Sequence, residues 1–272
     1  MIDNEELKIF LYEIREVYGY DFTEYSKSSL KRRLQYFMKL QKISDFKELS
    51  GIVIEDESKF ENLVQSITVN VTEMFRDPSF YKSLRNNVTS RLATYPFIKI
   101  WIAGCATGEE AYSMAILLKE ENLLSRSVIY ATDINQKVLQ NAKEGIYTYS
   151  DMQKHTANYI KAGGKRTLSE YYTAKYDSAI MDKSLKENIV FSVHNLTVDK
   201  SFNEFQIILC RNVLIYFNQS LQNKVINLFY ESLCVFGHLA LGNKESLYFS
   251  DKMKHFDDVD KKEKIFIKNT LS

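Results

Sequence analysis

One stretch of the chain decides the fold: IWIAGCATGEEAYS, which spans residues 100–113. An apolar run leads into Gly104 and Gly108, the acidic pair Glu109 and Glu110 follows, and apolar residues then recur at helical spacing. This order predicts a buried strand, a tight loop and the start of a helix. In parallel sheets, a loop of this kind at the carboxyl end of a strand is where a nucleoside-bearing cofactor binds.

From about residue 97 the chain alternates between strand-like and helix-like segments, which indicates a parallel sheet. The expected strands cover Ile98–Ala103, Val128–Thr132, Ile189–Val193, Ile207–Cys210 and His238–Leu241, with Ile265–Ile267 antiparallel to the last. The expected helices cover Glu109–Glu120, Gln136–Lys143 and Gln219–Cys234. We predict an α/β fold with a doubly wound, mostly parallel sheet that carries helices on both faces.

Three regions are expected along the chain. Residues 1–68 show apolar residues at helical spacing without strand alternation, which predicts a small all-helical N-terminal subdomain. Residues 69–96 are expected to form a linker and a helix that contribute to the cofactor site, and residues 97–272 a Rossmann-like domain. Within that domain, the tyrosine-rich stretch 147–187 is expected to begin as a helix and continue as a small antiparallel β-subdomain at the edge of the sheet.

Composition excludes several classes of protein. A net charge of +1 argues against a general nucleic-acid binder. The three cysteines lie far apart and the four histidines lack ligand spacing, so we expect small buried cysteines and no metal site. No window approaches the roughly 18 apolar residues of a membrane span. The acidic start of the chain also lacks a signal-peptide pattern, so we expect a cytoplasmic protein.

The loop chemistry narrows the kind of cofactor. Two glycines allow close approach of the backbone to a ligand, but Glu109 and Glu110 stand at the helix start, where they repel phosphate and suit the helix dipole. The loop therefore favours a cofactor that is neutral or cationic at this end. A plain tight turn with a helix-capping acid remains the alternative.

Asp133 closes the second expected strand, 25 residues after Gly108. A carboxylate at this position is placed to accept hydrogen bonds from both hydroxyls of a ribose. It could instead cap the next helix, but Asn135 can do so equally well and would leave Asp133 to the ribose.

Two arginines complete the candidate site. Arg76 lies in the segment NVTEMFRDP, residues 70–78, where a guanidinium could clamp a carboxylate, although the segment could simply be the capped start of a helix. Arg211 and Asn212 end a wholly apolar strand. A buried arginine there needs a partner, either a structural acid or a ligand.

Taken together, these segments resemble the CheR family of chemotaxis receptor methyltransferases. The resemblance rests on residues 70–78, 104–113, 131–133, 145–147, 194–196, 210–217 and 241–247, in the order and spacing of the family. It implies transfer of a methyl group from S-adenosylmethionine to glutamate side chains of chemoreceptors, with S-adenosylhomocysteine as the product. It also implies cofactor contacts at Asn70, Thr72, Arg76, Glu110, Asp133, Asn195, Leu196, Arg211 and Asn212, and a part in transfer for Arg76 and Tyr216.

The expected partners are the cytoplasmic helices of methyl-accepting chemoreceptors. Six basic residues and no acidic ones occur between residues 27 and 42. Chemoreceptor methylation helices are acidic, so we expect a docking face formed by Lys31, Arg32, Arg33, Lys39 and Lys42; a merely solvated helix surface is the alternative. In the family, the β-subdomain can bind a receptor pentapeptide tether. Gly163 and Gly164 support this weakly, and we expect recognition without a tether by a monomer.

The sequence also bears on three rival functions. A nucleic-acid methyltransferase would use a Pro-Pro-aromatic or Pro-Cys motif, but Pro78 precedes Ser79 and Pro96 precedes Phe97. A dinucleotide-dependent oxidoreductase would favour a third loop glycine and no glutamate pair. A non-catalytic sensor or scaffold that keeps the cofactor fold remains the alternative function.

Overall fold

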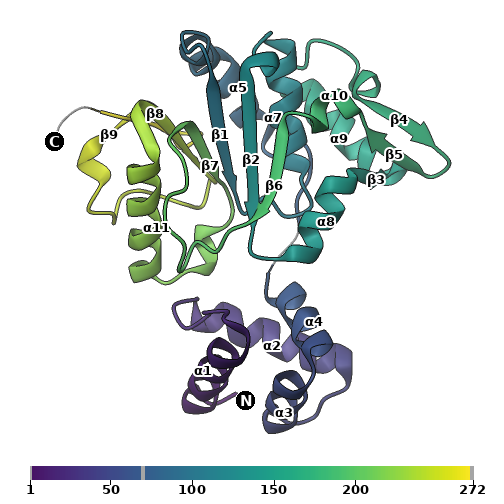
Figure 1. Ribbon diagram of the computed structural model, residues 1–272, viewed down its shortest axis with the longest axis vertical. Helices are drawn as coiled ribbons and strands as arrows, with labels where there is room; N and C mark the ends of the chain where they lie inside the picture. The colour runs from purple at the N-terminus through teal and green to yellow at the C-terminus, as the bar shows by residue number, and fades with distance from the viewer. Residues whose placement is uncertain (1, 69–70, 270–272) are drawn as a thin grey trace. The chain divides into compact units, whose positions relative to one another are not determined.

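The computed structural model describes residues 2–68 and 71–269. The chain divides into two compact units (Figure 1): one comprises Met1–Asn70 with Ile215–Lys224, and the other comprises Val71–Leu214 with Val225–Ser272. Each is described separately below.

The first unit is built from four helices, α1 to α4. They span Asn4–Tyr18, Lys27–Gln41, Phe46–Glu55 and Glu57–Ile67. Asp3, Asp45 and Asp56 cap α1, α3 and α4 by accepting backbone N–H bonds. Their apolar faces enclose one core that includes Phe10, Leu34 and Leu63, as the helical spacing predicts.

The segment Ile215–Lys224 packs with these four helices. Phe217 forms an isolated bridge with Tyr25, and their rings lie 5.0 Å apart between centroids. The Ser26 N–H, just before α2, donates to the carbonyl of Tyr216 at 2.8 Å.

The second unit is centred on a seven-stranded sheet of order β6-β2-β1-β7-β8-β10-β9. The five strands from β6 to β8 run parallel, while β10 and β9 add an antiparallel edge. The strands are β1 (Ile98–Ala103), β2 (Ser127–Asp133), β6 (Ile189–Val193), β7 (Phe205–Cys210), β8 (Leu233–Leu241), β9 (Phe256–Asp260) and β10 (Ile265–Lys268). The doubly wound, mostly parallel sheet is confirmed, and β9 is an addition that sequence reasoning missed.

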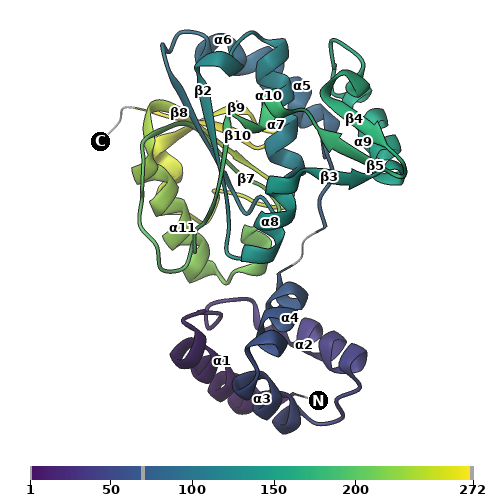
Figure 2. The ribbon, with the colours of Figure 1, turned by 45° about the vertical axis from the view of Figure 1, so that its right-hand side comes forward.

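Helices cover both faces of this sheet (Figure 2). Ile98, Ile100 and Ile102 of β1 join a core with residues of α5, α7 and α8. Trp101 points to the opposite face, where its ring lies 5.2 Å from that of Phe229 in α11. The helices of this unit are α5 (Pro78–Asn87), α6 (Thr89–Leu92), α7 (Glu109–Glu120), α8 (Gln136–Glu144), α9 (Tyr149–Lys161), α10 (Lys183–Lys186) and α11 (Gln219–Ser232), the last beginning in the first unit.

Short elements complete the chain. They are the 3-10 turns η1 (Leu124–Arg126), η2 (Leu168–Tyr171), η3 (Leu214–Tyr216) and η4 (Met253–His255). In the described part of the chain, no helix is both long enough and apolar enough to cross a bilayer.

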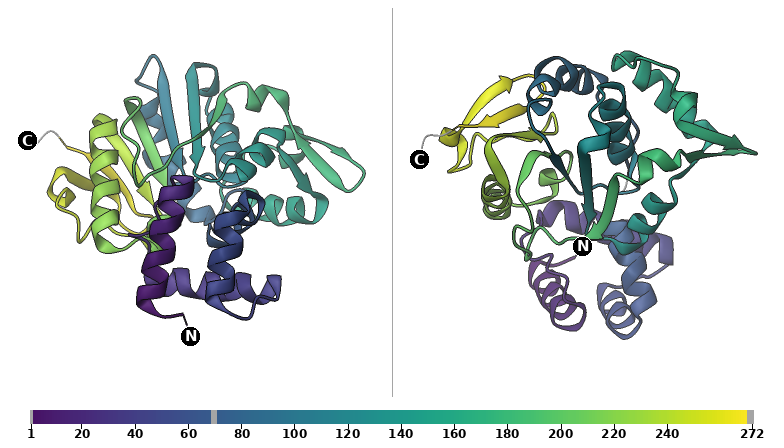
Figure 3. Two further views of the ribbon diagram at one scale, coloured as in Figure 1. Left: turned by 60° about the horizontal axis from the view of Figure 1, so that its bottom comes forward. Right: turned by 45° about the horizontal axis from the view of Figure 1, so that its top comes forward.

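The tyrosine-rich stretch forms a separate antiparallel sheet of order β3-β5-β4. Its strands are β3 (Ile146–Thr148), β4 (Tyr172–Lys175) and β5 (Ser178–Met181), and α9 lies between β3 and β4 in the chain. Figure 3 shows the β4–β5 hairpin projecting from the rest of this unit.

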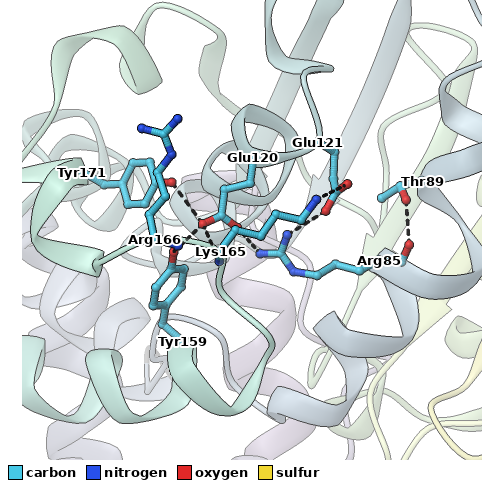
Figure 4. Close-up of polar contacts among 8 residues, drawn as sticks. All are labelled: Arg85, Thr89, Glu120, Glu121, Tyr159, Lys165, Arg166 and Tyr171. Atoms are coloured by element: carbon cyan, nitrogen blue, oxygen red, sulfur yellow. Dashed lines mark hydrogen bonds and ion pairs between the residues drawn. The ribbon is translucent and has the colours of Figure 1, made fainter.

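A buried polar cluster fixes this β-subdomain to the larger sheet's helices (Figure 4). The side chain of Glu120, at the end of α7, is fully buried. It accepts hydrogen bonds from the hydroxyls of Tyr159 and Tyr171 and from the Lys165 N–H, and it pairs with Arg85 of α5. The cluster therefore ties α5 and α7 to the last turn of α9 and to the end of η2.

Candidate active site

The candidate site lies at the carboxyl edge of the seven-stranded sheet. From β1 the chain passes through α7 to β2 on one side, and from β7 through α11 to β8 on the other, so the topology switches between β1 and β7. Ligands of doubly wound sheets bind outside such a switch point. The expected residues follow the strand ends there: Asp133 ends β2, Asn195 and Leu196 follow β6, and Arg211 and Asn212 follow β7.

Asp133 organises the loop after β1. Its Oδ2 accepts the Ala106 N–H at 3.0 Å and its Oδ1 accepts the Asn135 N–H at 2.9 Å. The cap of α8 is Asn135, whose side chain accepts from the N–H groups of Lys137 and Val138. The alternative that Asp133 caps this helix is therefore wrong, and the expectation that Asn135 does so is confirmed.

The environment of Asp133 fits a ribose. Asp133 is only 8% exposed. Burial raises the pKa of its carboxyl, and hydrogen bonds from backbone N–H groups oppose that shift. A carboxylate offers about four acceptor positions, so the backbone bonds of this loop leave acceptor capacity for a hydroxyl donor. A neutral hydroxyl suits this partly desolvated acceptor better than a second anion would.

The two loop glycines serve protein packing. Gly104 and Gly108 have φ values of 77° and 93°, a region that favours glycine. A Cβ on Gly104 would overlap the side chain of Val213, and one on Gly108 would lie 2.9 Å from the Cβ of Ala142. The space that a side chain would take therefore belongs to the neighbouring loop and to α8, so packing within the protein accounts for both glycines.

Carboxylates cover the start of α7. Glu109 is buried and accepts from the Thr107 hydroxyl at 2.7 Å, and burial raises its pKa to about 7. Glu110 accepts from Arg211 at 2.9 Å. A phosphate would meet these carboxylates at a helix end that otherwise attracts anions, so the site fits a cofactor without phosphate.

Structural acids are the partners of Arg211. Its side chain is only 2% exposed; Nη2 lies 2.7 Å from Asp77, and Nη1 lies 2.9 Å from Glu110. Both terminal nitrogens also donate to the backbone carbonyl of Arg76 at 3.3 Å. The guanidinium carbon lies 3.9 Å from the ring centroid of Phe80. Arg211 thus holds the segment before α5 in place. Of the two partners expected for a buried arginine here, a structural acid or a ligand, the structure shows structural acids.

Arg76 has the opposite environment. It is half-buried, and Nη1 donates to the Val71 carbonyl at 3.2 Å. Within the described residues it makes no ion pair. Its guanidinium therefore retains donors that suit a ligand carboxylate.

Glu245 anchors the loop after β7 and was missed in the sequence. Its buried carboxylate accepts the N–H groups of Gly242 at 2.6 Å, Asn212 at 3.0 Å and Val213 at 2.8 Å. Burial raises the pKa of this carboxyl, and the backbone donors oppose the shift. Its only local signal is the turn-forming glycine three residues earlier. Asp77, the second acid missed, precedes Pro78 at the start of α5.

Four residues near this edge have a left-handed backbone conformation that side chains rarely adopt. Phe75, Asp77, Ala106 and Asn212 have φ values of 53°, 56°, 48° and 63°. Non-glycine residues in this region cost about 1–3 kcal/mol each and cluster at functional sites. All four lie in segments that carry or adjoin the expected site residues.

The remaining expected contacts have simpler surroundings. Thr72 is half-buried, and Leu196 is 9% exposed. Asn195 accepts through Oδ1 from the N–H and hydroxyl of Thr197, which shapes the loop after β6. Asn70 lies outside the described residues.

Tyr216 and the basic residues belong to the first unit. Tyr216 is half-buried in η3. On α2, Leu30, Leu34 and Phe37 are buried, which confirms the expected apolar face. Among the basic residues, Arg32, Lys39 and Lys42 are exposed, and Lys31 and Arg33 are half-buried.

All three cysteines are buried and free, as expected. Burial raises the pKa of Cys105 and Cys210 well above its usual value. Among the described residues, no group of three or more histidine, cysteine, aspartate or glutamate side chains could hold a metal ion.

Comparisons with known proteins agree with this geometry. The family model described as CheR methyltransferase, SAM binding domain, matches residues 70–265, and the CheR all-alpha domain matches residues 5–68. Cher3 of Pseudomonas putida is 48% identical over 97% of this chain and 97% of its own length. Chemotaxis protein methyltransferases of Borreliella burgdorferi and Listeria monocytogenes are each 29% identical, over 90% and 88% of this chain and 89% and 90% of their own lengths.

Proposed function

The chain belongs to the CheR methyltransferase family, and from that premise we propose how its residues carry methyl transfer from S-adenosylmethionine to glutamate side chains of chemoreceptors. The activity is that of a protein-glutamate O-methyltransferase, and the product on the receptor is a methyl ester. The single observation that supports the residue assignment best is that two features occur together at the edge of the sheet. Asp133 is a buried acceptor suited to ribose hydroxyls, and carboxylates at the start of α7 disfavour a phosphate group.

The proposed cofactor contacts divide by chemistry. Asp133 accepts from the ribose hydroxyls, and Arg76 pairs with the carboxylate of the cofactor. Glu110 adds negative charge near the cofactor ammonium while it stays paired with Arg211. Asn70, Thr72, Asn195, Leu196 and Asn212 complete the proposed contacts, and Arg211 acts mainly through the Arg76 carbonyl.

In this reaction the enzyme must align the attacking carboxylate with the methyl group, and it need not transfer a proton. Bound S-adenosylmethionine supplies an electrophilic methyl group on a sulfonium. A glutamate has an ordinary pKa near 4.3, so the attacking carboxylate is already ionised at pH 7 and needs no general base. In this proposal Tyr216 donates to the incoming carboxylate and Arg76 contributes positive field. Both must orient the carboxylate without binding it so strongly that its nucleophilicity falls.

We further propose a cytoplasmic monomer that docks the acidic cytoplasmic helices of the receptor. Lys31, Arg32, Arg33, Lys39 and Lys42 would form the docking face. The exposed positions of Arg32, Lys39 and Lys42 support this assignment, because they leave the charges accessible.

Two measurements test the proposed function. The first follows labelled methyl groups from S-adenosylmethionine into chemoreceptor-containing membranes, with alkaline release of methanol to identify the ester. No transfer would contradict the activity. The second titrates S-adenosylhomocysteine calorimetrically into the native chain and Asp133→Asn, which keeps an acceptor oxygen for one of the two loop N–H groups. We expect at least tenfold weaker binding to the variant, and equal affinity would remove the ribose assignment.

A further inference from the structure

An exposed aromatic pair stands on the loop after β8. Tyr248 is 69% exposed and Phe249 is 68% exposed. Their ring centroids lie 5.1 Å apart with perpendicular planes, so the two rings support each other and form one apolar projection. Large aromatic side chains in water are costly for a monomer and are the side chains that most often anchor interfaces.

The loop presents the pair on a rigid turn. The Ser250 N–H donates to the Leu247 carbonyl at 2.8 Å, which places Tyr248 and Phe249 at the two central positions of a hydrogen-bonded turn. Leu247 is only 2% exposed and Ser250 is 8% exposed. Both ends of the turn are therefore anchored in the protein, and only its tip is presented to solvent.

The same loop is bonded to the loop after β7, which carries Asn212. Glu245, three residues before Tyr248, accepts the backbone N–H groups of Asn212 and Val213. Three residues span at most about 11 Å. The aromatic pair therefore stands within one short chain segment of the residues that follow β7, at the edge where the acceptor glutamate must arrive.

Charge around the pair favours an acidic partner. Lys244 and Lys254 are exposed on this loop and Lys252 is half-buried, against one exposed acid, Asp251. Met253, 46% exposed, adds a flexible apolar side chain. Exposed aromatic and thioether groups on a loop with more lysines than acids complement a helix that carries carboxylates beside apolar residues.

We propose that Tyr248 and Phe249 form a docking point for the methyl-accepting helix of the chemoreceptor, contacting apolar side chains next to the glutamate that is methylated. This inference rests on the proposed function and adds a specificity determinant to it.

The size of the projection fits a transient enzyme–substrate contact. Two aromatic side chains of this exposure offer roughly 200–350 Å², whereas a stable complex buries about 800 Å² on each partner. A stable dimer with a second copy of this chain would need far more buried surface than the pair supplies. A substrate that dissociates after each methyl transfer needs only a small contact of this kind.

The test is steady-state methylation of a soluble cytoplasmic receptor fragment by the full chain. The double variant Tyr248→Ser/Phe249→Ser should raise KM for the fragment about tenfold, with kcat changed less than twofold. Affinity for S-adenosylhomocysteine should be unchanged by calorimetry. Tyr248→Phe/Phe249→Tyr, which keeps both rings, should restore KM.

The matched control is Phe97→Ser, which removes a 48% exposed aromatic ring just before β1, at the opposite edge of the sheet. It should leave KM unchanged. An unchanged KM in the double variant would overturn the proposal, as would a KM effect seen only with receptors in membranes, which would indicate lipid contact. The proposal would also be overturned if the double variant dissociated a native dimer and left KM unchanged.

The failure of this inference can be distinguished from the failure of the proposed function. If the unaltered chain methylates no receptor at all, both are contradicted. If the chain methylates the receptor but the double variant has an unchanged KM, only this inference is contradicted.

Discussion

Arg76 and Arg211 are two arginines of one site with opposite energetics. Arg211 is enclosed by Asp77, Glu110 and the ring of Phe80, and it also donates to the Arg76 carbonyl. Arg76 is half-buried and pairs with no acid in the described residues. Burial without pairing is costly for a charge, whereas exposure with free donors suits binding. The first arginine therefore serves stability and the second is available to a ligand.

Substitution of each arginine by lysine should separate these roles. Arg211→Lys keeps the charge, but a single ammonium group cannot replace the two guanidinium nitrogens that pair with Asp77 and Glu110. We therefore expect the free energy of unfolding to fall by about 2–4 kcal/mol. Arg76→Lys should cost less than about 1 kcal/mol yet weaken S-adenosylhomocysteine binding at least tenfold. Urea denaturation and calorimetry measure the two effects. Equal stability losses in both variants would contradict the assignment.

Glu109 makes stability depend on pH. Burial raises the pKa of this carboxyl to about 7, well above its ordinary value near 4.5. The folded state therefore binds the proton more tightly than the unfolded state between these pH values, and the contribution of Glu109 to stability falls as pH rises from about 5 to 8. The full difference is about 3 kcal/mol at most.

The variant Glu109→Gln isolates this effect. Denaturant unfolding at pH 5, 6, 7 and 8 should show the native chain losing stability relative to the variant as pH rises. His238, whose pKa burial lowers to about 4, acts in the opposite direction below its usual pKa but is common to both proteins. A constant difference across the pH range would contradict the raised pKa of the buried Glu109 carboxyl.

Among the elements, α7 connects the two halves of the second unit. Its first turn carries Glu109 and Glu110 at the candidate site, and its last residue, Glu120, lies in the buried cluster that binds the β-subdomain (Figure 4). One helix therefore links the cofactor edge to the insert, and rigidity of α7 positions both.

Removing the carboxylate at the end of α7 should loosen the insert. Glu120→Ala leaves Nη2 of Arg85 and two tyrosine hydroxyls without their acceptor, while Nη1 of Arg85 keeps its pair with Glu121. We therefore expect a loss of about 2–4 kcal/mol in unfolding free energy. Glu170→Ala on the same insert should have a smaller effect, because its partners Arg166 and Thr167 are both exposed. Hydrogen exchange should show faster opening of α9 in the first variant. Unchanged protection would show that the cluster does not hold the insert.

The basic face of α2 is tested by charge reversal. Arg32→Glu/Lys39→Glu changes two exposed residues outside the apolar face, so the helical unit should remain folded. We expect KM for receptor to rise about tenfold at low salt and the effect to shrink with added salt, because exposed charges are screened. Lys8→Glu on α1 is the control. An unchanged KM at every salt concentration would remove α2 as a docking face.

At the scale of the whole molecule, a bound ligand should stabilise the chain by mass action. S-adenosylhomocysteine at 100 times its Kd should add about 2.7 kcal/mol, which corresponds to roughly 5–10 °C in Tm for a unit of this size. Thermal unfolding measures the shift, and Asp133→Asn should lose most of it at the same concentration. An equal shift in native and variant chains would place binding elsewhere.

The sequence by itself determined most of the larger sheet's elements and placed candidate residues at the ends of its strands. The spacing of apolar residues, the glycine turns and the capping residues all depend on neighbours in the chain. For this reason α7 and β1 have the bounds that the sequence predicts, and Asp133 stands at the end of β2 as expected. The N-terminal helices follow from the same local rules.

Only the tertiary structure decided which partner each site residue has. Arg211 meets acids 134 and 101 residues away, and Glu245 holds an N–H group 33 residues away. Val213 and Ala142, far from the loop in sequence, explain its two glycines. These pairings arise because the strand order brings separate strand ends to one edge, and no local pattern encodes which buried charge will find which partner.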